Sequence, residues 1–291
     1  MTTMPHAALL LCACQSAAPA WGSPAPPGFS KEISSGVFMP YVSLGHPDDN
    51  SSEVASLALW LRLGGVGIDT ALVYKNQKQV AEGLAQSGKA RDEVFITTKI
   101  PCFPAMTPAL ALDLVRFDLS ELRVSYVDLM LLHEPCKAEE DTQQAWLGLQ
   151  QAFDAGLARA IGVSNFARSD IDAVVKLGSP QPAVNQCRMS VGDHDDATRA
   201  YGEALGITYE AFSPLRHVDL SDPRLLQIAR AHRKSAAQVA LRWIVQQDVV
   251  LATSPGAVAS FAQADLELDS FALSSDEMAT LSAMAAQRAS R

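Results

Sequence analysis

The sequence predicts an α/β protein that folds as a single (β/α)8 barrel. Eight short runs rich in Val, Ile, Leu or aromatic residues alternate with segments that carry helix-start signals, at a spacing of roughly 25 to 30 residues. Such alternation is typical of parallel strands joined by right-handed crossovers, and eight units favour a closed barrel over an open sheet. A doubly wound open sheet is the alternative, but no G-x-G-x-x-G motif lies between a strand and a helix.

Each expected strand is a short run that should be buried. A short hairpin over residues 31–38 is expected ahead of the first strand, where it would close the bottom of the barrel. The eight barrel strands are expected over residues 39–44, 67–71, 94–100, 127–133, 159–163, 183–187, 207–212 and 249–253.

Helix starts are marked by capping residues between these runs. Thr107-Pro108 indicates an N-cap followed by proline at the first helical position. Capping boxes are predicted at Asn50-Ser51-Ser52-Glu53, at Ser235-Ala236-Ala237-Gln238 and at Ser274-Ser275-Asp276-Glu277, the last of which opens a final helix towards Arg288.

The first thirty residues differ from the rest of the chain. Residues 1–30 contain no Asp, Glu, Lys or Arg and hold five of the 16 prolines. We expect a disordered leader here, and a barrel domain over residues 31–291. A cleaved signal is the alternative, because residues 7–14 are apolar and Ala18-Pro19-Ala20 fits a cleavage site, although the positively charged segment of a signal peptide is missing.

Composition excludes several classes of function. The 291 residues carry 32 acidic and 23 basic side chains, a net charge of −9, and no run of basic residues. Nucleic acid and anionic membranes are therefore not expected as partners. No apolar run reaches the roughly 18 to 20 residues that a membrane-spanning helix needs.

The five cysteines show no metal-binding or disulfide pattern. Their number is odd, they are spread along the chain and no C-x-x-C pair occurs. We expect reduced thiols and no metal site. They are Cys12, Cys14, Cys102, Cys136 and Cys187.

Polar residues follow three neighbouring strands at the end where a (β/α)8 barrel carries its active site. Asp69 ends the second expected strand, and Tyr74 follows five residues later. Lys99 ends the third strand and His133 the fourth. A lone His at such a place is often only a hydrogen-bonded structural residue, but a Lys there needs a counter-ion, and Asp69 is the obvious one.

Together these four residues suit one reaction. Lys99, paired with Asp69 and placed beside a phenol, should lower the pKa of Tyr74 so that Tyr74 donates a proton near neutral pH. His133 would donate a hydrogen bond to a substrate oxygen. Such a group protonates a carbonyl oxygen as hydride reaches the carbonyl carbon, and a hydride donor is the missing part.

These residues resemble motifs of the aldo-keto reductases, and the resemblance covers about residues 33–285. Residues 67–76 are similar to the family's Asp/Tyr motif, residues 96–101 to its Lys strand, and residues 131–135 to its His strand. The resemblance implies a (β/α)8 enzyme that uses a nicotinamide cofactor without a Rossmann fold. It also implies that Asp69, Tyr74, Lys99 and His133 are catalytic, with Tyr74 the general acid in reduction.

The same resemblance implies a cofactor site. Residues 162–166 and 184–186 resemble the segments that hold the nicotinamide carboxamide, and residues 211–215 the segment that stacks on the nicotinamide ring and meets the diphosphate. The residues carried over as cofactor-binding are Ser164, Asn165, Gln186, Phe212, Ser213, Leu215, Thr253 and Ser254.

The chain departs from the family pattern in two places. The resemblance implies NADPH, yet no Lys or Arg lies between Arg242 and Arg288, where the family binds the 2′-phosphate of NADPH. NADH use, weak cofactor binding and compensation by Arg216 all stay open. On the substrate side, His46 and the following Pro47 stand where the family often has Thr-Trp. We expect His46 to be an exposed loop residue, and a replacement polar group in the substrate site is the alternative.

Two functions remain as hypotheses. The first is an NAD(P)H-dependent carbonyl reductase that acts on a small aldehyde or ketone; the second is a catalytically weak cofactor sensor or scaffold of the same fold. We expect a monomer. A cytoplasmic location is favoured, and residues 1–30 leave a secretory or organellar one open.

Overall fold

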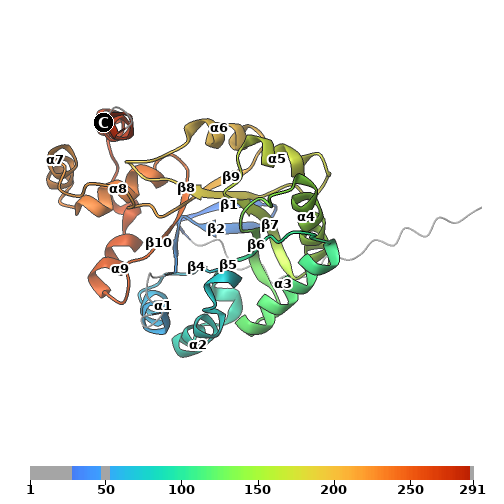
Figure 1. Cartoon of the computed structure of the whole chain (residues 1–291). Coiled ribbons are helices and arrows are strands. Elements are labelled where there is room, and N and C mark those ends of the chain that lie inside the picture. Colours follow the sequence, from blue (N-terminus) through green and yellow to red (C-terminus); the bar gives the residue numbers. More distant parts are fainter. Residues whose placement is uncertain (1–27, 47–52, 289–291) are drawn as a thin grey trace, which may run out of the picture.

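Eight parallel strands close into a barrel in the part of the chain that the structure, a computed structural model, describes: residues 28–46 and 53–288. Each strand pairs with the next one along the chain, and β10 pairs with β3 to close the ring. The predicted fold class is confirmed (Figure 1). The barrel strands are β3 (Val42–Leu44), β4 (Gly67–Asp69), β5 (Phe95–Ile100), β6 (Val127–Leu132), β7 (Ala158–Ser164), β8 (Val184–Arg188), β9 (Thr208–Phe212) and β10 (Val250–Thr253).

Helices surround this barrel (Figure 1). The α-helices are α1 (Glu53–Arg62), α2 (Gln77–Ser87), α3 (Pro108–Leu122), α4 (Glu139–Asp154), α5 (Arg168–Val175), α6 (Asp196–Ala204), α7 (Pro223–His232), α8 (Ala236–Val245), α9 (Ala259–Leu266) and α10 (Ser275–Arg288). The described residues also form the single 3-10 turns η1 (Leu72–Tyr74), η2 (Arg91–Glu93) and η3 (Leu268–Ser270).

The predicted helix starts are present where the structure describes them. The Thr107 side chain accepts a hydrogen bond from the Leu110 amide and Pro108 is the first residue of α3. Ser235 and Gln238 form the capping box of α8. At the start of α10, the Ser274 amide donates to Glu277 and the Glu277 amide to Ser274. The box predicted at residues 50–53 lies largely outside the described residues.

A hairpin precedes the barrel, as predicted. Strands β1 (Ser30–Ser34) and β2 (Val37–Pro40) pair antiparallel. Their apolar side chains Ile33, Val37 and Met39 belong to one buried cluster with residues of the barrel strands, so the hairpin packs on the barrel. The predicted run 39–44 is divided between β2 and β3, because Pro40 cannot donate a hydrogen bond that would continue the ladder. Residues 1–27 of the expected leader lie outside the described residues, and the fold begins slightly before the predicted residue 31.

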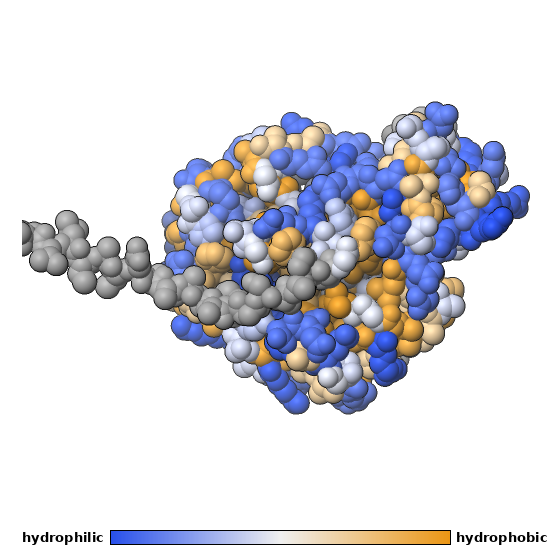
Figure 2. Space-filling model, turned by 180° about the vertical axis from the view of Figure 1, so that it is seen from behind, coloured by the Kyte–Doolittle hydropathy of each residue, from blue (hydrophilic) through white to orange (hydrophobic). Residues whose placement is uncertain are grey.

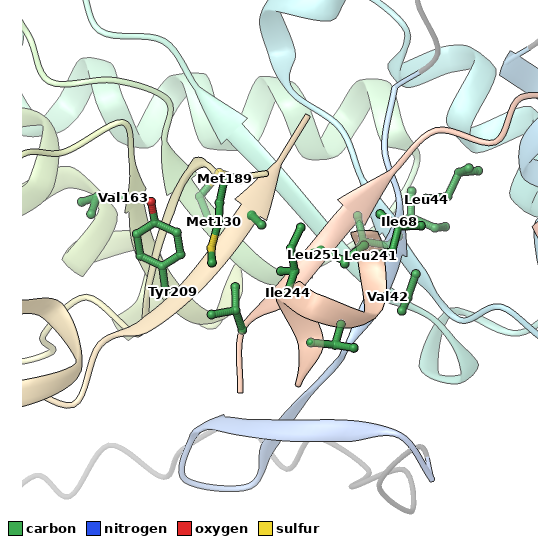
Figure 3. Packing of buried hydrophobic residues seen from close by; sticks show 14 of the residues in the cluster. Val42, Leu44, Ile68, Met130, Val163, Met189, Tyr209, Leu241, Ile244 and Leu251 are labelled. Atoms are coloured by element: carbon green, nitrogen blue, oxygen red, sulfur yellow. The ribbon is translucent and has the colours of Figure 1, made fainter. Parts of the chain in front are cut away.

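The main core lies between the strands and the helices. Figure 3 shows Leu241 and Ile244 of α8 beside Leu251 of β10. All three side chains are fully buried, and burying an aliphatic side chain of this size stabilises a fold by about 1.5 to 3 kcal/mol. The face shown in Figure 2 carries polar side chains with apolar ones in patches between them. None of the helices in the described ranges combines the length and the apolar character that crossing a membrane requires.

Two of the cysteines are paired, which corrects the expectation of reduced thiols. Cys102 follows β5 and Cys136 follows β6, and the two form a disulfide with Cα atoms 5.3 Å apart. Since β5 and β6 are adjacent, the loops that leave them lie together, although Cys102 and Cys136 are 34 positions apart in the sequence. Cys187 is a free thiol, and Cys12 and Cys14 lie outside the described residues.

Candidate active site

A buried ion pair lies at the carboxyl ends of β4 and β5. The Lys99 ammonium is fully buried and donates to both carboxylate oxygens of Asp69 at 2.8 Å, and to the Thr70 carbonyl oxygen at 3.0 Å. The expectation that Asp69 is the counter-ion of Lys99 is confirmed. Parallel pairing of β4 with β5 sets Asp69 opposite Thr97, which brings the two charged side chains to the same end of the barrel.

The pair keeps Lys99 charged. Burial lowers the pKa of Lys99, but the charge of Asp69 and the other groups around it raise that pKa, and the net shift is upwards. Lys99 is therefore an ammonium ion throughout the physiological pH range. An unpaired ammonium in this position would be strongly destabilising.

Tyr74 lies against this ion pair. It ends the turn η1, and Lys75 closes that turn in the left-handed backbone region at φ 58°. The Lys99 Nζ atom is 5.3 Å from the centroid of the Tyr74 ring. His46 stacks on the same ring at a centroid distance of 4.9 Å, and His133 meets its edge at 5.6 Å.

The pKa of Tyr74 differs from the prediction. Burial raises the pKa of Tyr74 above its usual value, and the positive charge of Lys99 lowers it by less. The influence of Lys99 has the predicted sign, but the predicted net lowering is wrong because the phenol is largely removed from water. Tyr74 consequently keeps its proton at neutral pH.

His133 is neutral. Its amide donates to the Ile100 carbonyl oxygen, which fixes the backbone just after β6. Burial, followed by the charge of Lys99, lowers the pKa of His133 to about 4. Its buried Nδ1 atom has no hydrogen-bond partner among the described residues. A neutral imidazole at this place can donate a hydrogen bond from one ring nitrogen.

His46 was expected to be exposed, and the structure places it in the site instead. The ring stacks on Tyr74, and Nδ1 lies 2.8 Å from the buried Glu53 carboxylate and 3.1 Å from the Asn76 side-chain amide. The Asn76 side chain is itself held by the Thr70 hydroxyl at 2.7 Å. The sequence favoured an exposed His46 over a polar group of the substrate site because its partners come from α1 and from the segment after η1, which only the fold brings to it.

The three residues expected to hold a carboxamide lie at the ends of β7 and β8. The Gln186 side-chain amide donates to Asp69 at 2.9 Å, which joins this group to the ion pair. The Ser164 hydroxyl donates to the Gln186 carbonyl oxygen, and the Asn165 side-chain amide donates to the His133 carbonyl oxygen at 3.0 Å. Asn165 takes the left-handed backbone conformation, at φ 60°, that Asn adopts more readily than most residues.

A cavity of about 610 Å³ opens beside Tyr74. Five of the eight predicted cofactor residues and two of the predicted catalytic residues line it. Its size and its mixed lining suit a nucleotide ligand. The lining residues are Gly45, His46, Asp69, Tyr74, Phe212, Ser213, Pro214, Leu215, Arg216, Ala252, Thr253 and Ser254.

The end of the cavity at β10 has no basic residue of its own. The Thr253 hydroxyl donates to the buried Asp265 carboxyl at 3.0 Å, and burial raises the pKa of Asp265 to about 6. Val258 and Phe261, at the start of α9, are exposed and apolar. Arg216, on the loop after β9, is the permanent cation among the described residues that line the cavity.

Glu210 is a further charged residue that the sequence reasoning missed. It lies inside β9 and is fully buried near Asp69 and Lys99. The signal was available, because an acidic residue within an apolar strand raises the same question of a partner as Lys99 does.

Comparison with known proteins agrees with this geometry. Residues 42–286 match the family model described as Aldo/keto reductase family. Morphine 6-dehydrogenase from Pseudomonas putida is 38% identical over 270 residues, which cover 86% of this chain and 88% of that protein. Glyoxal reductase from Bacillus subtilis is 36% identical over 224 residues, 75% of this chain and 79% of that protein.

A solved structure shows the same likeness in three dimensions. The crystal structure of an aldo/keto reductase from Brucella melitensis superimposes with a TM-score of 0.82 at 27% identity, covering 89% of this chain and 100% of that chain. The family match over most of the chain, and two relatives that are themselves named as a dehydrogenase and a reductase, agree with a barrel that carries a buried Asp–Lys pair beside a tyrosine. The chain therefore belongs to the aldo/keto reductase family and is an oxidoreductase.

Proposed function

We propose that the protein reduces aldehydes or ketones to alcohols with hydride from NADPH or NADH, and that Tyr74 is the general acid. The observation that supports this most directly is the position of Tyr74, between the buried Asp69–Lys99 pair and the neutral His133, at the wall of the 610 Å³ cavity. Tyr74 then presents a proton donor at the cavity wall, with the Lys99 cation and the His133 ring beside its own ring.

Each residue has one role in this reaction. A reduced nicotinamide supplies the hydride, which forms the new C–H bond at the carbonyl carbon. The Tyr74 hydroxyl gives its proton to the carbonyl oxygen, so that the C=O double bond becomes a C–OH single bond. Tyr74 afterwards regains a proton from solvent.

Lys99 makes this proton transfer easier. As the Tyr74 proton leaves, negative charge develops on the phenol oxygen, and the nearby ammonium stabilises it in a buried setting where charge interactions are strong. Asp69 holds Lys99 in place through two hydrogen bonds. His133, uncharged because its pKa is lowered to about 4, donates a hydrogen bond to the substrate oxygen without competing as an acid.

The cofactor would lie along the cavity. Ser164, Asn165 and Gln186 do not line this cavity, and we propose by family resemblance that they would hold the nicotinamide carboxamide. Phe212 offers its half-buried ring as a stacking surface. Ser213 and Leu215 would hold the diphosphate, and Thr253 and Ser254 would hold the adenosine end.

The cavity end proposed for the adenosine discriminates only weakly between NADPH and NADH. NADPH differs from NADH by a 2′-phosphate, and residues 243–287 offer it no Lys or Arg. Arg216, which also lines the cavity, is the group that can still attract that phosphate. We therefore propose that both nucleotides bind, with NADPH favoured only as far as Arg216 reaches it.

Membership of the family supports a carbonyl substrate but does not fix its size. The names of two relatives refer to morphine and to glyoxal, which differ greatly in size. We propose a small carbonyl compound as the substrate of this chain, bound beside Tyr74 and His46.

The proposed cofactor binding is tested by titrating the full chain with NADPH and then with NADH, with intrinsic fluorescence as the readout. Turnover is then measured with 4-nitrobenzaldehyde and the nucleotide that binds. Binding together with oxidation of the reduced nucleotide supports the reductase. Failure of both nucleotides to bind would contradict it and would favour a scaffold of the same fold.

A further inference from the structure

Glu210 is a fully buried acid in the interior of the barrel. It lies in β9, in register with Gln186 of β8 on one side and with Val250 of β10 on the other. The Gln186 side-chain amide donates a hydrogen bond to Asp69 at 2.9 Å, so a single residue, Gln186, connects Glu210 to the ion pair. Neither neighbour in register ionises.

Glu210 is not stabilised as an anion by hydrogen bonds. Neither of its carboxyl oxygens has a hydrogen-bond partner of good geometry among the described residues, although the Gln186 amide lies near it. A buried carboxylate without strong donors is costly, and the group lowers this cost by keeping its proton. Burial, and then the negative charge of Asp69, raise the pKa of Glu210 to about 8.

The charged and titratable groups that face Glu210 all belong to the proposed active site. Asp69 comes from β4, Lys99 from β5 and Tyr74 from η1. A negative charge on Glu210 raises the pKa values of both Tyr74 and Lys99. The protonation of Glu210 is therefore linked to the acidity of Tyr74 by the charges themselves.

We propose that Glu210 is a positioning residue for the proposed carbonyl reduction. The reaction is fast while Glu210 is uncharged, and it slows when Glu210 ionises in alkali. This inference rests on the proposed function. When Glu210 is neutral, Asp69 is the one carboxylate facing Lys99 among these groups, and the remaining field of Lys99 acts on the Tyr74 oxygen. When Glu210 is charged, it offsets the field of Lys99, and the phenol becomes a weaker acid.

The variant Glu210→Gln keeps the size of the side chain and removes its ionisation. At saturating cofactor and substrate, we expect kcat of the unaltered protein for reduction to fall by about three- to tenfold as pH rises through about 8. We expect Glu210→Gln to keep its neutral-pH kcat across the same range, within about twofold. Glu210→Met, an apolar side chain of similar length, should show the same flat profile if Gln at this place impairs folding.

Asp118→Asn is the matched control. Asp118 is also fully buried, burial raises its pKa to about 7, and its carboxyl accepts a hydrogen bond from Thr98. The charge of Lys99 acts on Asp118 as it does on Glu210, but Asp69 and Tyr74 are not among the groups that act on Asp118. We expect Asp118→Asn to keep the alkaline fall of the unaltered protein. A fall that disappears in Asp118→Asn but persists in Glu210→Gln would overturn the proposal.

A second measurement does not depend on turnover. The absorbance of tyrosinate is followed against pH, and the spectrum of the Tyr74→Phe variant is subtracted to isolate Tyr74 from the other four tyrosines. We expect Tyr74 to ionise about one pH unit lower in Glu210→Gln than in the unaltered protein. Equal Tyr74 titrations would overturn the role of Glu210. Absence of any carbonyl turnover would instead overturn the proposed function, while the Tyr74 titration would still decide the influence of Glu210.

Discussion

The Lys99 ammonium binds both carboxylate oxygens of Asp69 at 2.8 Å while its Nζ atom lies 5.3 Å from the centre of the Tyr74 ring. The side chain of Lys99 is therefore shared between a structural partner that keeps it charged and a phenol that it can polarise. This division distinguishes it from an ordinary buried salt bridge, whose charges only satisfy each other.

Replacement of Lys99 should remove catalysis. Lys99→Met deletes the charge that stabilises the ionised phenol and leaves Asp69 buried without its cation, so we expect kcat to fall by about 10²-fold or more, with a marked loss of stability. Lys78→Met is the control, because Lys78 is 67% exposed and lies on the outer helix α2. Reduction of 4-nitrobenzaldehyde by both variants is the measurement, and a rate for Lys99→Met equal to that of Lys78→Met would contradict the role of Lys99.

His133 should not titrate near neutral pH. Its pKa is lowered to about 4, so the native protein binds fewer protons than the unfolded chain between about pH 4 and the ordinary His value of 6.5. The His133 contribution to stability therefore rises with pH across this window and is lost as pH falls through it. We expect the imidazole signals of His133 in NMR, identified with His133→Gln, to stay in the neutral form from pH 5 to pH 8. A midpoint near 6.5 would contradict a buried, neutral His133.

Asp118 should change stability with pH in the opposite direction to His133. Burial raises its pKa from 3.8 to about 7, so between these values the native state holds a proton that the unfolded chain has released. Stability from this group is present in acid and is lost as pH rises towards 7. We expect Asp118→Asn to exceed the unaltered protein in free energy of unfolding at pH 8, by about 1 to 3 kcal/mol, and to approach it at pH 4. Denaturant unfolding at both pH values measures this, and an equal difference at the two would show that Asp118 does not titrate as described.

Arg216 should contribute to the choice of cofactor. It is the permanent cation among the described residues lining the cavity, and NADPH carries more negative charge than NADH. We expect Arg216→Ala to weaken NADPH binding by about tenfold and NADH binding by less. Arg230→Ala, at an exposed position on α7, is the control. Fluorescence titrations give the four dissociation constants, and equal losses for both nucleotides would mean that Arg216 does not act on the 2′-phosphate.

The barrel and the proposed catalytic residues could be predicted because each depends on a local pattern. A Lys near the end of a buried strand needs a counter-ion, and parallel pairing of adjacent strands brings Asp69 to Lys99 whatever the loops do. The helix starts at Thr107 and Ser235 were predictable for the same reason, since a cap involves residues only a few positions apart.

What the sequence did not reveal depends on the surroundings of a residue in the fold. His46 looks like a loop residue until Glu53 and Asn76 are brought beside its ring. Cys102 and Cys136 lack a recognisable spacing, since their pairing arises from the loops after two adjacent strands. The net pKa of Tyr74 could not be inferred from its neighbours alone, because burial, which has the larger effect, is a property of the packed site.

The Tyr74→Phe variant tests the central claim most directly. The substitution keeps the ring that packs against His46 and His133 and removes only the hydroxyl. Its dissociation constant for NADPH and NADH and its kcat for 4-nitrobenzaldehyde are measured beside those of the unaltered protein. We expect unchanged cofactor affinity and a kcat lower by about 10²- to 10⁴-fold, as befits the loss of a general acid. Reduction by Tyr74→Phe at the rate of the unaltered protein would contradict Tyr74 as the proton donor.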